Sequence, residues 1–272
     1  MAELEGSDTE AAPAALAPLR SDPGGAAILL DVDGTLAPIV ARPDEAAVPE
    51  ATRELLRALA HPYALVACVS GRRALDARRV VGLGELAYSG NHGFELLLPG
   101  DDEPRPDPSL DGRDADAPSF VAALDRAELD RAGLRIEDKG AIVALHWRGA
   151  DNEGEAESLA SEIASEAEWQ GLVPHRGRKV LEIRPNVPIT KGIAVAAMVA
   201  AKPVRAALYA GDDRTDLDAF TALRTLRDDG ALAAVVCVAV AAGETPPEIA
   251  EAADLTVAGS DGVVELLRAL AA

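Results

Sequence analysis

The stretch that decides the fold is Ile28-Leu29-Leu30-Asp31-Val32-Asp33-Gly34-Thr35-Leu36. An apolar run ends there in two aspartates, Asp31 and Asp33, and a turn-forming glycine follows them directly. Because alternate side chains of an extended chain point the same way, the two carboxylates share one side. They repel each other unless a cation lies between them or one of them holds a proton. The stretch therefore predicts a buried strand that ends in a site for a divalent cation, a phosphoryl group or a proton transfer.

Apolar strands alternate with helical patterns on both sides of a central segment. The expected strands are 27–31, 64–69, 86–89, 206–210 and 233–240, and the expected helices are 49–60, 72–81, 191–201, 216–226 and 261–270. This alternation is typical of an α/β fold in which helices cover both faces of a parallel sheet. In such sheets the ligand crevice lies at the carboxyl ends of the strands, so the residues directly after each strand matter most.

The residues between the two halves follow a different pattern. Segment 100–118 is rich in acidic residues and proline, as in a linker. After it we expect a helix at 119–131, strands at 134–137 and 141–147, a helix at 153–169, and strands at 172–174 and 180–184. This order, αββαββ, describes a smaller α+β unit inserted into the parallel domain. The predicted domains are a core at 26–98 and 188–272, an insert at 99–187, and an N-terminal tail at 1–25, in which residues 11–19 form either a helix or a disordered tail.

The composition limits the kinds of partner. With 26 basic and 46 acidic residues the net charge is −20, which argues against binding nucleic acid or an anionic membrane surface. The N-terminus lacks a secretory pattern, and the longest uncharged apolar run, 231–242, is too short to cross a bilayer. Cys68 and Cys237 lie in apolar runs, as buried cysteines of a reducing compartment do. We expect a cytoplasmic monomer with a small-molecule partner, no nucleic acid and no membrane.

Polar residues cluster at four places where this fold would bring them to one crevice. They are Asp31 with Asp33, the triplet Ser70-Gly71-Arg72, Lys191, and the run 211–216 with Asp212, Asp213 and Asp216. Each has a structural alternative: Ser70 can cap a helix, Lys191 can lie on the surface, and acids such as Asp212 and Asp213 are favoured where helices begin. Their occurrence at successive strand ends is better explained by one joint site.

These residue types suit phosphoryl transfer. A carboxylate such as Asp31 can form an aspartyl-phosphate, and Mg²⁺ binds carboxylates together with substrate phosphate and water. Asp31 and Asp212 would supply such carboxylates, and Asp33 would protonate the leaving alkoxide and then activate water. The phosphate oxygens would be held by hydrogen-bond donors, namely Ser70, the amide of Gly71, and Lys191.

The motifs DVDGTL at 31–36, SGR at 70–72, the Lys191 site and GDDRTD at 211–216 resemble the four motifs of the haloacid dehalogenase (HAD) superfamily. The resemblance implies that Asp31 is the nucleophile and Asp33 the general acid/base. It implies a Mg²⁺ site formed by Asp31, Asp212 and the main-chain carbonyl of Asp33, with Asp213 and Asp216 in support. It also implies a HAD-like Rossmannoid core whose insert is a cap of the C2 type, placed after the second motif.

Longer stretches are similar to trehalose-6-phosphate phosphatases. They are GNHGFE at 90–95, EDKG at 137–140, ALHWR at 144–148 and GRKVLEIRP at 177–185. This resemblance implies Mg²⁺-dependent hydrolysis of trehalose 6-phosphate to trehalose and phosphate; Leu217 departs from it, since the family often has an acid there. The alternatives are a related phosphatase for sucrose phosphate or mannosyl-phosphoglycerate, a hexose phosphomutase, and a non-catalytic sugar-phosphate sensor.

The resemblance also implies residues that bind the phosphate or the sugar: Thr35, Gly71, Arg72, His92, Glu95, Arg148, Lys179 and Glu182. Strand alternation places Glu182 and Arg184 on one face and Lys179 on the other. Only one of Lys179 and Glu182 is therefore expected to face the sugar, and we favour Glu182. Trp147 either packs in a core or stacks on the sugar, and we favour the core.

Overall fold

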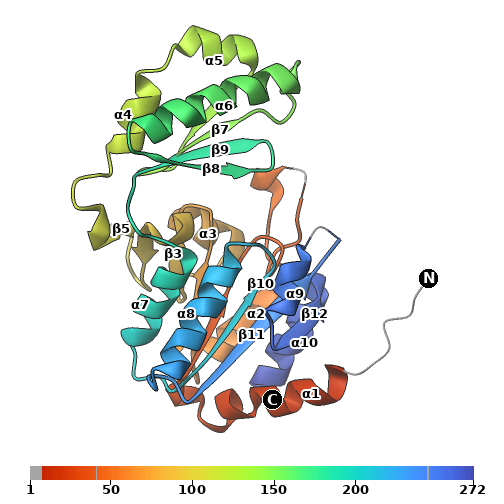
Figure 1. Ribbon diagram of the computed structural model, residues 1–272. Coiled ribbons are helices and arrows are strands. Elements are labelled where there is room, and N and C mark those ends of the chain that lie inside the picture. The colour runs from red at the N-terminus through yellow and green to blue at the C-terminus, as the bar shows by residue number, and fades with distance from the viewer. Residues whose placement is uncertain (1–7, 41, 244) are drawn as a thin grey trace. The chain divides into compact units, whose positions relative to one another are not determined.

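The computed structural model describes residues 8–40, 42–243 and 245–272, and the chain divides into two compact units (Figure 1). Unit 1 comprises Met1–Arg105 and Ile189–Ala272, and unit 2 comprises Pro106–Pro188. The chain therefore leaves unit 1 once, forms unit 2, and returns to complete unit 1.

Unit 1 is built on an eight-stranded sheet with the order β12-β11-β10-β1-β2-β3-β4-β5. The parallel strands are β1 (Ala26–Leu30), β2 (Leu65–Val69), β3 (Ala87–Gly90), β10 (Ala206–Gly211), β11 (Ala234–Ala241) and β12 (Leu255–Ala258). Strand β4 (Glu95–Leu97) runs antiparallel to β3, and β5 (Arg105–Pro106) lies at the edge. The mostly parallel sheet confirms the predicted fold class, while β4, β5 and β12 are strands that the sequence pattern did not predict.

Helices cover both faces of this sheet. Helices α1 (Asp8–Ser21), α2 (Glu50–Ala60), α3 (Ala74–Val81) and α10 (Gly259–Ala271) pack on one face, and α7 (Lys191–Ala200), α8 (Asp216–Asp228) and α9 (Pro247–Glu251) pack on the other. Along β1, Ile28 and Leu30 face the first group, whereas Leu29 faces the second. Continuing this alternation, Asp31 points to the face that carries α7 and α8.

The N-terminal residues belong to the core of unit 1. Residues 8–21 form helix α1, although the sequence allowed either a helix or a tail, and residues 1–7 lie outside the described residues. Leu16 and Leu19 are completely buried in the apolar cluster that includes α10. Helix α1 therefore contributes directly to the packing of unit 1.

Unit 2 has a four-stranded antiparallel sheet with the order β6-β7-β9-β8. The strands are β6 (Arg135–Asp138), β7 (Val143–His146), β8 (Val173–Gly177) and β9 (Val180–Arg184), and one face is covered by α4 (Asp116–Ala122), α5 (Arg126–Ala132) and α6 (Glu153–Trp169). The expected single helix over 119–131 is two helices, because Asp125 accepts hydrogen bonds from the first amides of α5 and starts a new helix. Trp147 is buried in this unit's core.

Both cysteines, Cys68 and Cys237, are buried and free. Burial raises the pKa of the Cys237 thiol to about 12, so it stays protonated and behaves as a small apolar residue. Among the residues that the structure describes, no helix combines the length and the apolar character that a membrane crossing requires.

Candidate active site

The candidate residues of unit 1 begin at the carboxyl ends of three neighbouring strands. β1 lies between β10 and β2 and is parallel to both. Asp31 follows β1, and its backbone amide donates to the carbonyl of Ala210 in β10 over 2.9 Å. Asp212 follows β10 and Ser70 follows β2. The parallel register therefore places these three residues along one edge of the sheet, as the strand-end argument predicts.

Lys191 lies at the centre of a buried ion-pair cluster. Its Nζ atom is 2.7 Å from Asp31 Oδ1 and 2.8 Å from Asp216 Oδ1, and its side chain is 2% exposed. Helix α7 begins at Lys191 because the Thr190 side chain accepts a hydrogen bond from the amide of Ile193. Burial would lower the pKa of Lys191, but Asp216 and Asp31 outweigh it and hold that pKa well above its usual value. Lys191 is therefore a charged, internal lysine.

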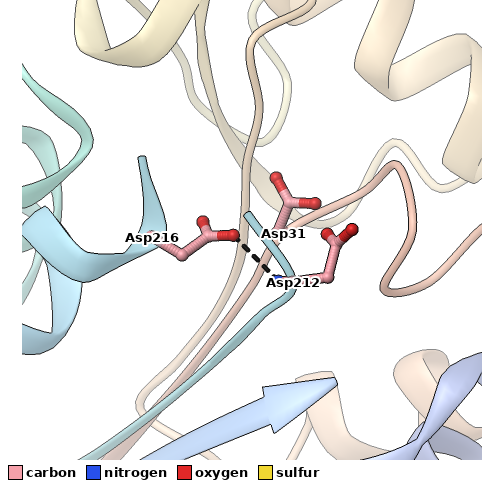
Figure 2. A group of neighbouring side chains, drawn as sticks. All are labelled: Asp31, Asp212 and Asp216. Carbon is pink, nitrogen blue, oxygen red and sulfur yellow. Dashed lines mark hydrogen bonds between the residues drawn. The ribbon is translucent and has the colours of Figure 1, made fainter. Parts of the chain in front are cut away.

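Asp216 fixes the loop that carries Asp212. Its Oδ1 atom accepts hydrogen bonds from Lys191 and from the hydroxyl of Tyr209, the latter at 2.6 Å. Its Oδ2 atom accepts from the amides of Asp212 at 2.9 Å, the contact drawn in Figure 2, and of Asp213 at 3.0 Å. Both oxygens are thus engaged by the protein, so Asp216 orients Lys191 and the loop after β10.

The loops after β1 and β10 pack directly on each other. Gly34 has a φ of +87°, and a Cβ atom there would lie 2.1 Å from Asp212 Oδ2. The position therefore requires glycine both for its conformation and for the close approach. Thr35 Oγ1 donates to Asp212 Oδ1 over 3.4 Å. These contacts direct the Asp212 carboxylate toward Asp31, as Figure 2 shows.

The buried carboxylates can hold a divalent cation. Oxygens of Asp31, Asp212 and Asp216 all lie within 4.8 Å of one another. Burial raises the pKa of Asp31 well above its usual value, although Lys191 opposes this effect. Burial and the neighbouring Asp216 raise the pKa of Asp212 to about 7. The cluster is therefore short of positive charge, and hard carboxylate oxygens are the ligands that Mg²⁺ prefers.

Asp33 forms a different contact. Arg72 donates from Nε to Asp33 Oδ2 over 2.6 Å and from a terminal nitrogen to Asp33 Oδ1 over 2.7 Å. In the same turn, the Ser70 hydroxyl oxygen accepts from the backbone amide of Arg72 at 3.1 Å. The turn after β2 is thus joined to the loop after β1 by a bidentate ion pair, which the sequence pattern did not predict.

The segment after β3 places its two candidates differently. His92 packs on the turn after β2, because a Cβ atom at Gly71 would lie 2.7 Å from its ring. Its φ of +58° is unusual for a residue other than glycine. Glu95 accepts a hydrogen bond from the amide of Ala74, the first residue of α3, at 2.5 Å. His92 therefore lies beside the Ser70–Arg72 turn, whereas Glu95 holds the beginning of a helix.

In unit 2 the three candidates are in three different settings. Glu182 is buried in β9, where its carboxylate pairs with Lys139 at 2.7 Å and with Arg184 at 2.5 Å. Lys179 lies outside β9 with a φ of +61°, and its amine pairs with Glu153 at 2.6 Å. Arg148 is exposed after β7.

Polar residues line the sheet face of unit 2 that is not covered by α4–α6. In the antiparallel register, Ala144 of β7 lies opposite both Glu137 and Glu182, and Glu137 pairs with His146 over 2.7 Å. Sequence reasoning did not select Glu137, Lys139 or Tyr209. Their positions in the sequence could have indicated them. Glu137 and Lys139 lie in the motif at 137–140, whose strand is separated from that of the candidate Glu182 only by β7, and Tyr209 is the one hydroxyl-bearing residue of β10.

Comparisons with known proteins complete this description. The model of the family described as Trehalose-phosphatase matches residues 29–252. A Mycobacterium tuberculosis protein described as an uncharacterized glycosyl hydrolase is 35% identical over 205 residues, covering 73% of this chain and 15% of that protein. Trehalose 6-phosphate phosphatase RA3 of Zea mays is 34% identical over 218 residues, covering 73% of this chain and 59% of that protein. The chain thus spans less than two thirds of the length of these relatives.

A solved structure is similar to this chain over residues of both units. The crystal structure described as that of a trehalose-6-phosphate phosphatase related protein has a TM-score of 0.67 and 27% sequence identity. The match covers 89% of this chain and 95% of that chain, so it includes both units.

Proposed function

Because this chain belongs to the trehalose-phosphatase family, we propose that it hydrolyses trehalose 6-phosphate to trehalose and inorganic phosphate. The observation that carries the proposal is the buried contact of Lys191 with Asp31, beside Asp212. A charged lysine next to a carboxylate nucleophile offsets the repulsion that a dianionic phosphate would otherwise meet. This arrangement is costly to bury and suits a phosphate-transfer site better than a purely structural role.

The proposed reaction has two steps. In the first, an oxygen of Asp31 attacks phosphorus and forms an aspartyl-phosphate while the bond from phosphorus to the sugar oxygen breaks. Asp33 gives its proton to that oxygen, so trehalose leaves as an alcohol. In the second, the Asp33 carboxylate takes a proton from water, and the water oxygen attacks phosphorus. The bond to Asp31 breaks, and inorganic phosphate is released.

Other residues of unit 1 hold the phosphate. Lys191, the Ser70 hydroxyl and the amide of Gly71 donate hydrogen bonds to its oxygens, and the donor capacity of these groups supports this role. Asp31, Asp212 and the main-chain carbonyl of Asp33 would hold Mg²⁺, which would supply further charge neutralisation. Thr35 orients Asp212, and Asp213 and Asp216 hold the loop in which Asp212 lies; the hydrogen bonds of Thr35 and Asp216 support this division.

For the sugar, Glu182 is the favoured contact in unit 2. A carboxylate accepts hydrogen bonds from sugar hydroxyls, and Lys139 and Arg184 fix its orientation. Lys179 is less suited, because its amine already pairs with Glu153. The remaining proposed phosphate or sugar contacts are His92, Glu95 and Arg148, whereas the guanidinium group of Arg72 already pairs with Asp33.

The proposal is tested by phosphate release from a panel of sugar phosphates, with and without Mg²⁺, using Asp31→Asn as the inactive control. We expect Mg²⁺-dependent release with the highest kcat/KM for trehalose 6-phosphate. A higher value for sucrose phosphate or mannosyl-phosphoglycerate would overturn the substrate assignment. Interconversion of glucose 1-phosphate and glucose 6-phosphate without net phosphate release would indicate a mutase, and binding without turnover would indicate a sensor.

A further inference from the structure

The contact between Arg72 and Asp33 joins two loops of unit 1 that are far apart in sequence. The two parallel hydrogen bonds, 2.6 and 2.7 Å long, link residues separated by 39 positions. Such a fork fixes both the distance and the plane of a carboxylate, which a single hydrogen bond or a lysine ammonium does not. The contact therefore determines where the Asp33 carboxyl group points.

The backbone on each side of this contact is held firmly. The Arg72 amide donates to Ser70 Oγ over 3.1 Å, and the Arg72 carbonyl accepts from the amide of Asn91 over 2.6 Å. In the other loop, the amide of Gly34 donates to the carbonyl of Ala37 over 2.8 Å. Because both loops are fixed by their own hydrogen bonds, the guanidinium group transmits a defined position to Asp33.

The pair lies partly in contact with solvent. The side chain of Arg72 is 18% exposed and that of Asp33 is 39% exposed, so water screens the pair and it adds less to stability than the same contact would in the buried core. An ion pair that served mainly to hold the two loops together would be more effective in the buried core. The contact fixes the orientation of the Asp33 carboxyl group closely, while solvent limits what it adds to stability. This combination is expected of a contact that orients a functional group.

We propose that Arg72 is a positioning residue for Asp33. One arm of its guanidinium group keeps the Asp33 carboxyl group in place while the other Asp33 oxygen carries the proton of the first step, and both arms hold the carboxylate that takes a proton from water in the second step. This inference rests on the proposed function, in which Asp33 serves as the general acid/base. It assigns Arg72 a task other than direct contact with the phosphate or the sugar. In this role Arg72 acts entirely through Asp33.

The test compares a poor and a good leaving group in the same variants. Trehalose leaves only with a proton from the general acid, whereas p-nitrophenolate leaves without one, so the rate of aspartyl-phosphate formation from p-nitrophenyl phosphate is insensitive to Asp33. Rapid mixing measures this first step for both substrates. For Arg72→Gln we expect a loss of about 100-fold with trehalose 6-phosphate and less than about 3-fold with p-nitrophenyl phosphate.

Two further variants guard against a general structural effect. Arg73→Gln removes the neighbouring positive charge and is expected to change both rates by less than about 2-fold. Arg72→Lys keeps the charge but not the fork, and is expected to show the same selective loss to a smaller extent. Equal losses on the two substrates in both Arg72 variants, or a rise in KM without a change in the first step, would overturn the inference.

A double-mutant cycle tests whether Arg72 acts through Asp33. In an Asp33→Asn background, Arg72→Gln should lower the rate with trehalose 6-phosphate by less than about 2-fold. Independent, multiplicative losses would mean that Arg72 contacts the substrate itself and would overturn the inference. If the wild-type protein hydrolyses a different sugar phosphate, the proposed substrate is wrong, and the same ratio measured with that sugar phosphate still decides the role of Arg72.

Discussion

The two units arrange their polar residues in opposite ways. In unit 1 the candidates Asp31, Ser70 and Asp212 follow neighbouring parallel strands and are buried, and Lys191 links Asp31 to Asp216. In unit 2 they come from an antiparallel sheet, and only Glu182 is buried in a network of ion pairs. Lys179 lies in a turn and Arg148 on an exposed segment.

This difference shows how topology restricts function. Parallel strands end at the same edge, so the residues after them converge whatever the intervening helices contain. An antiparallel sheet ends its strands at two opposite edges, so candidates from neighbouring strands and turns separate. We therefore expect substitutions in unit 1 to lower kcat and substitutions in unit 2 to act mainly on KM. The following predictions test this contrast, in order of decreasing effect.

The largest effect is expected for Asp31, the proposed nucleophile. Asp31→Asn should lower kcat by about 10⁴-fold or more, because no other residue supplies the attacking oxygen. Steady-state phosphate release measures this loss, and circular dichroism should show an unchanged fold. If Asp31→Asn kept more than a few per cent of the wild-type activity, the nucleophile would be another residue. The expected contrast, with kcat effects in unit 1 and KM effects in unit 2, would then lose its main evidence.

Removal of the central amine should affect both rate and stability. Lys191→Met leaves the Asp31 and Asp216 carboxylates buried without their partner, which should lower the free energy of unfolding by about 3 kcal/mol. The rate should fall by about 100-fold or more, since positive charge beside the phosphate is lost. Urea denaturation and phosphate release measure the two effects. Lys202→Met, at an exposed position, is the matched control and should change neither.

Cation binding in unit 1 should depend on pH through Asp212. Its pKa of about 7 is above the unfolded value, so the folded state binds a proton more tightly and this group's contribution to stability falls as pH rises from about 4 to about 7. Mg²⁺ competes with that proton and should raise the melting temperature more at pH 8 than at pH 6. Thermal unfolding with and without Mg²⁺ measures the difference. An equal Mg²⁺ effect at both pH values would contradict the role of Asp212, and Asp212→Asn should weaken the dependence to the part that Asp31 contributes.

In unit 2 the larger effect is expected at Glu182. Glu182→Gln should raise KM for trehalose 6-phosphate by about 10-fold with a smaller change in kcat, because an interaction with the bound sugar is lost in substrate and transition state alike. Kinetics with p-nitrophenyl phosphate, which has no disaccharide, provide the control and should be almost unchanged. A loss confined to kcat would place Glu182 in the chemistry and remove the contrast.

The smallest effect is expected at Lys179. Its half-exposed ion pair with Glu153 belongs to the class whose removal costs little, so Lys179→Gln should change KM and kcat by less than about 2-fold. The same assay used for Glu182 measures it. A KM effect equal to that of Glu182→Gln would mean that the turn, and not only the strand, binds the sugar.

The sequence predicted the parts of unit 1 that depend on local pattern. Apolar runs marked β1 and β10, and the residues directly after them include Asp31 and Asp212, whose carboxylates the structure brings together. The burial of Lys191 depends instead on where α7 begins and on which side of the sheet it packs. The ion pair between Arg72 and Asp33 likewise arises only when β1 and β2 are neighbours. Such contacts are properties of the tertiary structure and leave no periodic signal.

Elsewhere the misses have local causes. Asp125 accepts amide hydrogen bonds that end one helix and begin another, and a continuous apolar periodicity hides this break. Strand β12 lies at the edge of the sheet and has one buried residue, so it lacks the continuous apolar run that marks the inner strands. Lys179 adopts a left-handed backbone conformation outside β9, so the alternation of that strand does not apply to it.

Helix α1 has a practical consequence for anyone who shortens this protein. The family match begins at residue 29, so a version trimmed to that boundary would lose α1 and the first residues of β1. The apolar surface that Leu16 and Leu19 cover would then be exposed to solvent. Exposed apolar patches of this kind promote aggregation during expression. The family match marks the residues that relatives share, but the folding unit of this protein begins before residue 29 and includes α1. Recombinant versions are therefore best started upstream of α1.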